Sequence, residues 1–156
     1  MSIRAPGPLS LAALALTLLV SAGLAPASDS EETPRTRDHM STQEEPSRLA
    51  VLWTSGDREV ALKVAFMYTH NAKLRGWFDE VTLIVWGPSA NLLSEDQELQ
   101  ASVKDMAEAG VEVVACQACA DGYGVSEVLR GMGIDVKYMG MPLTEMLKGD
   151  WEVITF

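Results

Sequence analysis

From residue 49 to the end of the chain, short continuous runs of apolar residues alternate with longer stretches in which apolar positions recur at helical spacing. A continuous apolar run that ends in turn residues is typical of a strand buried on both faces, whereas helical spacing is typical of an amphipathic helix. The pattern therefore predicts five strands, over residues 49–56, 80–87, 111–116, 134–139 and 151–156.

The stretches between these strands predict four helices, over residues 57–76, 94–110, 125–133 and 142–149. The first helix has apolar positions that share one face, namely Val60, Ala61, Val64, Ala65 and Tyr68. Ser94 and Gln97 have the spacing of a capping box, which favours a helix start at that point. Pro142 and Gly149 bracket the last helix, as is typical of a helix start and a helix end.

Strands that are apolar throughout and are separated by helices indicate a parallel sheet with helices on both faces. We therefore expect an α/β fold, a three-layer α/β/α sandwich with a five-stranded parallel sheet. Residues 48–156 have the length of one ordinary domain.

The residues before this domain have a different composition. Residues 1–27 have the features of a signal peptide, with a basic Arg4, an apolar run over 9–24 and small residues at Ala25 and Ala27. The run is shorter than the ~20 residues that span a membrane, although an uncleaved anchor is the alternative. Residues 28–47 are polar and charged, which predicts a flexible linker. We expect a periplasmic or otherwise extracytoplasmic protein without stable membrane association after cleavage.

The net charge of −10 limits the classes of partner. An acidic surface repels nucleic acid and anionic lipid, so we expect neither as a partner.

Ligands of open parallel sheets gather at the carboxyl ends of the strands. Several candidate ligand-binding residues follow the predicted strands there: Thr54, Ser55, Trp86, Gly87, Met139 and Gly140. Together with Trp53, Tyr138 and Met141, the aromatic and methionine residues of this edge suit a small-ligand pocket, a subunit interface or ordinary core packing.

Cys116 and Cys119, the two cysteines of the chain, are the candidate catalytic residues. Cys116 ends the third predicted strand and faces the start of the following segment, whose free N–H groups favour a thiolate. A thiolate is a nucleophile, so the position suits covalent sulfur chemistry. Because cysteine is also often a buried packing residue and small apolar residues surround the pair, structural packing is an equal alternative.

The stretches LWTSGDREVALKVAFMY, LRGWFDEVTLIVWGPSA, VVACQACADGYGV and VKYMGMPLTEMLK closely resemble the DsrE-like family, the DsrE/DsrF/DsrH and TusD group of sulfur-relay proteins. The chain is most similar to an exported branch of that family. The resemblance implies a parallel five-stranded sandwich, assembly as trimers or hexamers, and a persulfide on the cysteine that ends the third strand. Cys116 and Gly124 match the spacing of the relay cysteine and its following glycine, whereas Cys119 has no counterpart there.

Three functions follow from these residues. The first is thiol-based sulfur handling through Cys116, as a persulfide carrier or sulfurtransferase-like protein with donor and acceptor proteins or small thiols as partners. In this function Cys119 either leaves the persulfide in place or attacks it and releases sulfide. The second is a C-x-x-C dithiol redox protein, although the predicted topology lacks the late antiparallel hairpin of thioredoxins. The third is a non-catalytic binding or assembly module.

We expect no cofactor and no metal. Two cysteines with nearby methionines suit Cu(I), but a structural zinc needs four ligands. The chain has only two histidines besides its two cysteines, with His39 in the linker and His70 on the first helix.

Overall fold

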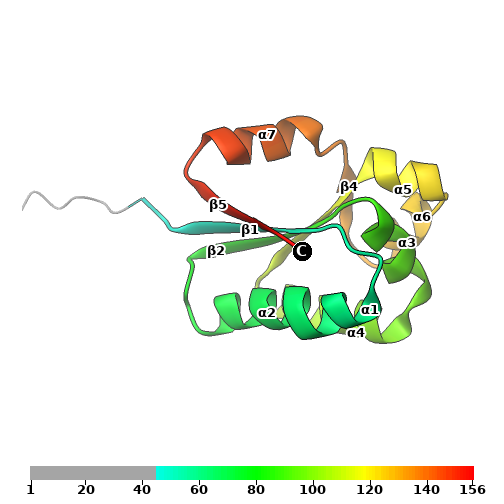
Figure 1. Ribbon diagram of the computed structural model, residues 1–156, viewed down its shortest axis with the longest axis horizontal. Coiled ribbons are helices and arrows are strands. Elements are labelled where there is room, and N and C mark those ends of the chain that lie inside the picture. Colours follow the sequence, from blue (N-terminus) through cyan, green and yellow to red (C-terminus); the bar gives the residue numbers. More distant parts are fainter. Residues whose placement is uncertain (1–44) are drawn as a thin grey trace, which may run out of the picture. The chain divides into compact units, whose positions relative to one another are not determined.

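The computed structural model describes residues 45–156 (Figure 1). The predicted signal peptide and the predicted linker up to residue 44 lie outside these described residues. Ser47, within the described part, is tied to the domain because its hydroxyl donates to the Asp79 carboxylate at 2.8 Å. Among residues 45–156, no helix is long and apolar enough to cross a membrane.

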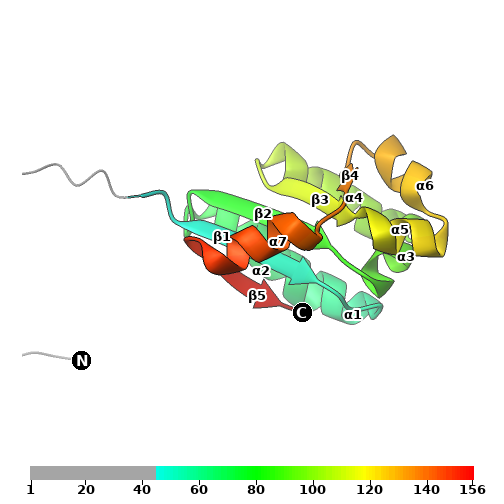
Figure 2. The ribbon, with the colours of Figure 1, turned by 90° about the horizontal axis from the view of Figure 1, so that it is seen from above.

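The five predicted strands are confirmed, and they form one parallel sheet in the order β4-β3-β2-β1-β5 (Figure 2). The strands are β1 (Arg48–Trp53), β2 (Glu80–Val85), β3 (Glu112–Cys116), β4 (Asp135–Lys137) and β5 (Trp151–Thr155). Val81 to Val85 of β2 are all buried, as expected for a central strand covered on both faces.

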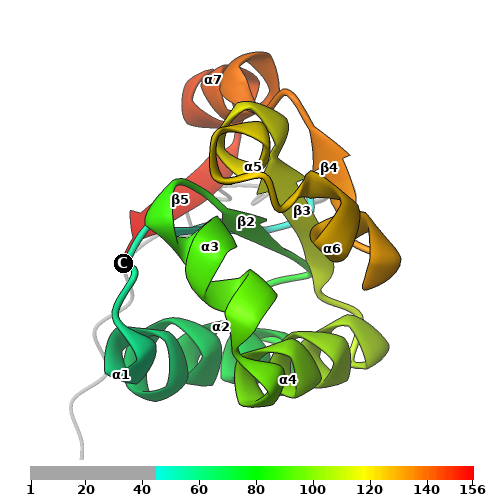
Figure 3. The same cartoon turned by 90° about the vertical axis from the view of Figure 1, so that its right-hand side faces the viewer.

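The helices are α1 (Arg58–Val60), a π-helical turn η1 (Ala61–Ala65), α2 (Phe66–Leu74), α3 (Pro88–Glu95), α4 (Gln97–Glu108), α5 (Gln117–Tyr123), α6 (Ser126–Gly131) and α7 (Gly140–Lys148). Helix α7 lies on one face of the sheet, and α2 and α4 lie on the other (Figures 1 and 3). This arrangement is the expected three-layer α/β/α sandwich.

The π-helical turn corrects the predicted face of the first helix. Ala61 and Ala65 are fully buried, as predicted, but Val64 is 39 % exposed. A π turn adds a residue to the helical repeat and so rotates the positions that follow it. The buried side chains of α2 are consequently Phe66, Thr69 and Ala72.

The predicted capping box is wrong. Ser94 lies inside α3, where its hydroxyl donates to the Asn91 carbonyl at 2.7 Å. Asp96 is the N-cap of α4, and its carboxylate accepts the N–H groups of Glu98 and Leu99. Helix α3 itself was not predicted from the pattern.

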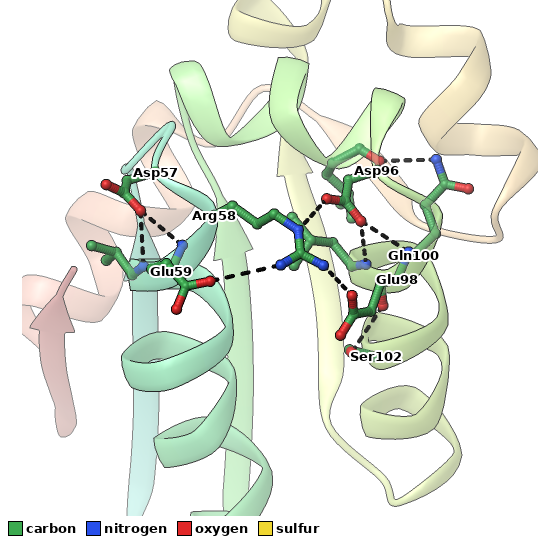
Figure 4. A network of polar contacts seen from close by, with 10 residues as sticks. Asp57, Arg58, Glu59, Asp96, Glu98, Gln100 and Ser102 are labelled. Carbon is green, nitrogen blue, oxygen red and sulfur yellow. Dashed lines mark hydrogen bonds and ion pairs between the residues drawn. The ribbon is translucent and has the colours of Figure 1, made fainter.

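The N-cap Asp96 also belongs to an ion-pair network that joins two helix starts (Figure 4). The Arg58 Nε donates to Asp96 at 2.7 Å, and the same guanidinium pairs with Glu98. Asp57 caps α1 by accepting the N–H of Glu59 at 2.7 Å. The network fixes α1 against α4 on the side of the sheet that is away from α7.

Buried residues form two hydrophobic cores, one on each face of the sheet. The large core lies between the sheet and the helices α2 and α4, and it also contains Leu129 of α6. The small core lies under α7 and consists of Ala50, Ile84, Val114, Cys116 and Met139. Because side chains alternate along a strand, Val114 and Cys116 point to the small core while Ala115 points to the large core.

Candidate functional site

The strand order places a crevice at the carboxyl ends of β3 and β4. The chain moves outward from β1 to β4 and then returns across the sheet through α7 to reach β5. The connection after β3 contributes Leu129 of α6 to the large core, whereas the connection after β4 covers the opposite face. Adjacent strands whose connections leave toward opposite faces mark a switch point, where ligands of open α/β sheets bind.

Cys116 lies at this switch point. It is the last residue of β3, and its backbone is paired with that of Lys137 of β4. It is also the N-cap residue of α5, with an extended backbone conformation. Its side chain is 4 % exposed because its position in the strand turns it into the small core.

Cys119 lies one helical turn after Cys116, and its side chain is half-buried. Residues three apart at a helix start share a face, so the C-x-x-C spacing brings the two sulfurs together. The Cys119 thiol donates to the Cys116 Sγ at 2.9 Å, and both cysteines are free.

The surroundings of Cys119 favour the protonated form of its thiol. Burial is the main cause that raises the pKa of the Cys119 thiol, and the contact with Cys116 raises it further. The backbone N–H of Gly87 contacts the same sulfur and acts in the opposite direction. The result is an asymmetric pair in which Cys119 is the hydrogen-bond donor and Cys116 the acceptor.

Several predicted ligand-binding residues do gather around this pair. Met139 is 1 % exposed and belongs to the small core with Cys116, and Trp86 packs against that core. Gly87 has a φ of 70°, a conformation that favours glycine, and it is the N-cap of α3. These three residues form the apolar and backbone surroundings of the thiols.

Thr54, Ser55 and Gly140 make other contacts. The Thr54 hydroxyl donates to the Phe156 carbonyl at 2.9 Å, and the Ser55 hydroxyl accepts the N–H of Asp57 at 3.0 Å. Gly140 is exposed at the start of α7, where its carbonyl accepts the Thr144 hydroxyl at 2.8 Å. Their predicted role in ligand binding stays a prediction.

The other aromatic and methionine residues at this edge of the sheet are partly buried in a core and partly exposed on the surface. Trp53 is fully buried in the large core and packs edge-on against Phe66 at 4.8 Å between ring centroids. Tyr138 and Met141, in contrast, are 68 % and 67 % exposed. Trp53 is therefore a packing residue, whereas Tyr138, just before α7, and Met141, on α7, are available on the surface.

Two residues of this site were not predicted. Leu143 and Met146 of α7 pack against the small core that contains Cys116. Their spacing from Met139 is that of one helical face, so the periodicity of α7 contains the signal that identifies them.

Within residues 45–156, no three His, Cys, Asp or Glu side chains are grouped as metal ligands. A cavity of about 630 Å³ lies on the other face of the sheet, lined by residues of α4 and of β3 together with Met132, Gly133 and Ile134. Val113 lines it, whereas the neighbouring Val114 belongs to the small core with Cys116.

The comparisons with known proteins cover this whole domain. The model of the DsrE/DsrF-like family matches residues 48–156. The structure is similar to that of BT1422 from Bacteroides thetaiotaomicron, a conserved protein of unknown function, with a TM-score of 0.68, 34 % identity, and coverage of 70 % of this chain and 95 % of that chain. The ychN protein from E. coli shares the fold, with a TM-score of 0.56, 15 % identity, and coverage of 70 % and 99 %. No curated protein is significantly similar to this chain.

Proposed function

The chain belongs to the DsrE/DsrF-like family, and on that premise we propose that it handles sulfane sulfur through Cys116. The family is associated generally with sulfur relay. In the proposed reaction, the Cys116 thiolate attacks a sulfane sulfur atom of a donor. A new S–S bond forms on Cys116, the bond between that sulfur and the rest of the donor breaks, and the donor leaves with the electron pair.

One observation carries this proposal. Cys116 ends β3 at the switch point of the sheet, and its sulfur accepts a hydrogen bond from the Cys119 thiol at 2.9 Å. The thiolate is the nucleophile in sulfur transfer, and the switch point is where ligands of such sheets bind.

Mass spectrometry of the intact protein tests the proposal. The protein is incubated without oxygen with an inorganic polysulfide, and the Cys116→Ser and Cys119→Ser variants are treated in parallel. We expect Cys119→Ser to gain the mass of one sulfur atom and Cys116→Ser to gain none. Equal sulfur addition to the two variants, or no addition to either, contradicts a carrier role for Cys116.

A dithiol redox protein is the second candidate, and the 2.9 Å approach of the two free thiols favours it. The sheet of residues 45–156 is parallel throughout, so it lacks the antiparallel hairpin of thioredoxins. Reduction of insulin disulfides by the reduced protein separates the candidates. A rate at the level of Cys119→Ser rejects the redox function, and a rate well above that level supports it.

We also propose that the protein is exported, because residues 1–27 have the composition of a signal peptide. Fractionation of cells that express the full chain, followed by N-terminal sequencing, tests this. The expected product is extracytoplasmic and begins after Ala27. A cytoplasmic product that retains residues 1–27 contradicts it.

Members of the family generally form oligomers and sulfur relay complexes. We propose that this chain forms a trimer or hexamer through the face that carries α7. Helix α7 has no buried residue, its Met141 and Leu147 are 67 % and 63 % exposed, and Tyr138 just before it is exposed as well. Large exposed apolar patches are typical of interfaces.

A matched pair of variants tests the α7 interface. Leu147 on α7 and Leu74 on α2 are each 63 % exposed, and they lie on helices at opposite faces of the sheet. Sedimentation of the wild type should give an oligomer, which Leu147→Glu converts to monomer while Leu74→Glu does not. A monomeric wild type, or dissociation by Leu74→Glu alone, contradicts this interface.

A further inference from the structure

We propose that the site reduces sulfane sulfur to sulfide, with Cys119 discharging the persulfide that forms on Cys116. This inference deepens the proposed function and rests on it. It assigns a chemical role to Cys119, the cysteine that has no counterpart in the relay pattern, and it names the product.

The geometry decides which sulfur Cys119 reaches. In a persulfide, Cys116 Sγ is the inner sulfur, and the added sulfur lies about 2 Å beyond it, the length of an S–S bond. The Cys119 Sγ is 2.9 Å from that inner sulfur. Attack on the inner sulfur expels the outer one, whereas attack on the outer sulfur would only transfer it. The contact therefore favours release over transfer.

The step balances without a further reactant. Cys119 loses its proton, and its sulfur forms a bond to Cys116 Sγ while the bond from Cys116 Sγ to the added sulfur breaks. The added sulfur leaves as HS⁻ with the bonding electron pair and takes up a proton to become H₂S. The sulfane sulfur is reduced, and the two cysteine sulfurs are oxidised to a disulfide. A dithiol reductant then restores both thiols by exchange.

The burial of Cys116 limits the size of the sulfur donor that can reach it. Cys116 is 4 % exposed, while Cys119 beside it is half-buried and reaches the surface. The small core and the adjoining side chains Trp86, Leu143 and Met146 crowd the remaining sides of Cys116. The chain of an inorganic polysulfide is one atom wide, so it needs less space to reach the buried Cys116 than a protein donor or a branched small molecule does. We therefore assign inorganic polysulfide as the substrate class.

The test measures the mass of the intact protein and the amount of sulfide released into solution. Reduced wild type, Cys119→Ser and Cys116→Ser are treated with inorganic polysulfide without oxygen, freed of small molecules and weighed intact, and the sulfide in solution is measured. A sample of wild type without polysulfide should keep both thiols. Cys119→Ala repeats the measurement with a second side chain, and melting curves establish that each variant is folded.

We expect the wild type to lose the mass of two hydrogens and to release one more sulfide per chain than Cys119→Ser. We expect Cys119→Ser and Cys119→Ala to keep one added sulfur. If the wild type keeps the added sulfur as these variants do, the discharge by Cys119 is overturned while the carrier function of Cys116 stands. If Cys119→Ser gains no sulfur, or Cys116→Ser gains as much, the carrier function itself is overturned.

Discussion

Met139 belongs to the same small core as the Cys116 side chain, and we expect its replacement by alanine to expose the thiol without unfolding the domain. Met139 is 1 % exposed in the small core. A buried Met→Ala substitution costs about 2–5 kcal/mol. The neighbouring Leu143 and Met146 are only partly buried and can move into the space, so we expect the lower part, roughly 2–3 kcal/mol.

Met106 on α4 provides a matched control. It is also 1 % exposed, but it lies in the large core on the opposite face of the sheet. Met106→Ala should destabilise the domain by at least as much as Met139→Ala. For a domain near 100 residues, each kcal/mol lowers the melting temperature by roughly 4–8 °C. Met139→Ala should therefore melt roughly 8–24 °C below the wild type, and Met106→Ala should melt at least as far below it.

The two variants should differ in thiol reactivity. If the opening that admits a reagent is local to the small core, its free energy falls by the roughly 2–3 kcal/mol lost in Met139→Ala. Since 1.4 kcal/mol is a factor of about ten, Cys116 should react roughly 30- to 140-fold faster. Met106→Ala should leave the rate close to that of the parent.

The assay is alkylation by iodoacetamide under native conditions, followed by intact mass. Both substitutions are made in a Cys119→Ser background, in which Cys116 is the sole cysteine of the chain. Equal acceleration in the two variants would show that Cys116 is reached only by global unfolding. An unchanged rate in Met139→Ala would show that Met139 does not cover the thiol. Either result refutes the proposed local opening at the small core.

Two further predictions concern stability. Gly124 ends α5 with a φ of 72°, so Gly124→Ala should lower the free energy of unfolding by about 1–2 kcal/mol. Gly122 lies inside the same helix, so Gly122→Ala should raise the free energy of unfolding by roughly 0.5–1 kcal/mol. Equal effects of the two substitutions in urea titrations would contradict this prediction. The pKa of Asp96 is lowered below its ordinary value of 3.8, first by the Leu99 N–H and then by Arg58, so its charge stabilises the fold above that value and the stabilisation is lost as the pH falls. The difference in urea midpoint between wild type and Asp96→Asn should therefore shrink in acid, and a difference independent of pH would refute the assignment.

The sheet was predictable from the sequence because its strands are continuous apolar runs between turn residues. Helix α3 was not, because the predicted strand over residues 80–87 ends at Gly87, and the same Gly87-Pro88 also forms the start of a helix. Proline is favoured in the first turn of a helix, where its missing N–H costs no hydrogen bond. Ser89 then anchors α3 by donating to the Trp53 carbonyl at 2.6 Å, a contact between residues 36 positions apart that no local pattern contains.

The closeness of the two cysteine sulfurs was predictable from the sequence, but the deeper burial of Cys116 was not. The C-x-x-C spacing after a strand places the two sulfurs on one side of a helix start. The deep burial of Cys116 depends on Met139, which enters the same core only because the chain returns over the sheet after β4. That path is a property of the strand order, so the local sequence around the cysteines does not specify it.

The asymmetry of the pair has a chemical consequence that composition alone would not suggest. A sulfur carrier that delivers to another protein needs its loaded sulfur at the surface, yet Cys116 is the more buried of the two cysteines. A site that releases a small product needs only a narrow exit and a second thiol in contact with the inner sulfur. Cys119 supplies that contact, and its side chain is half-buried where that of Cys116 is buried. The burial that hinders delivery to a large acceptor is thus compatible with discharge of sulfide.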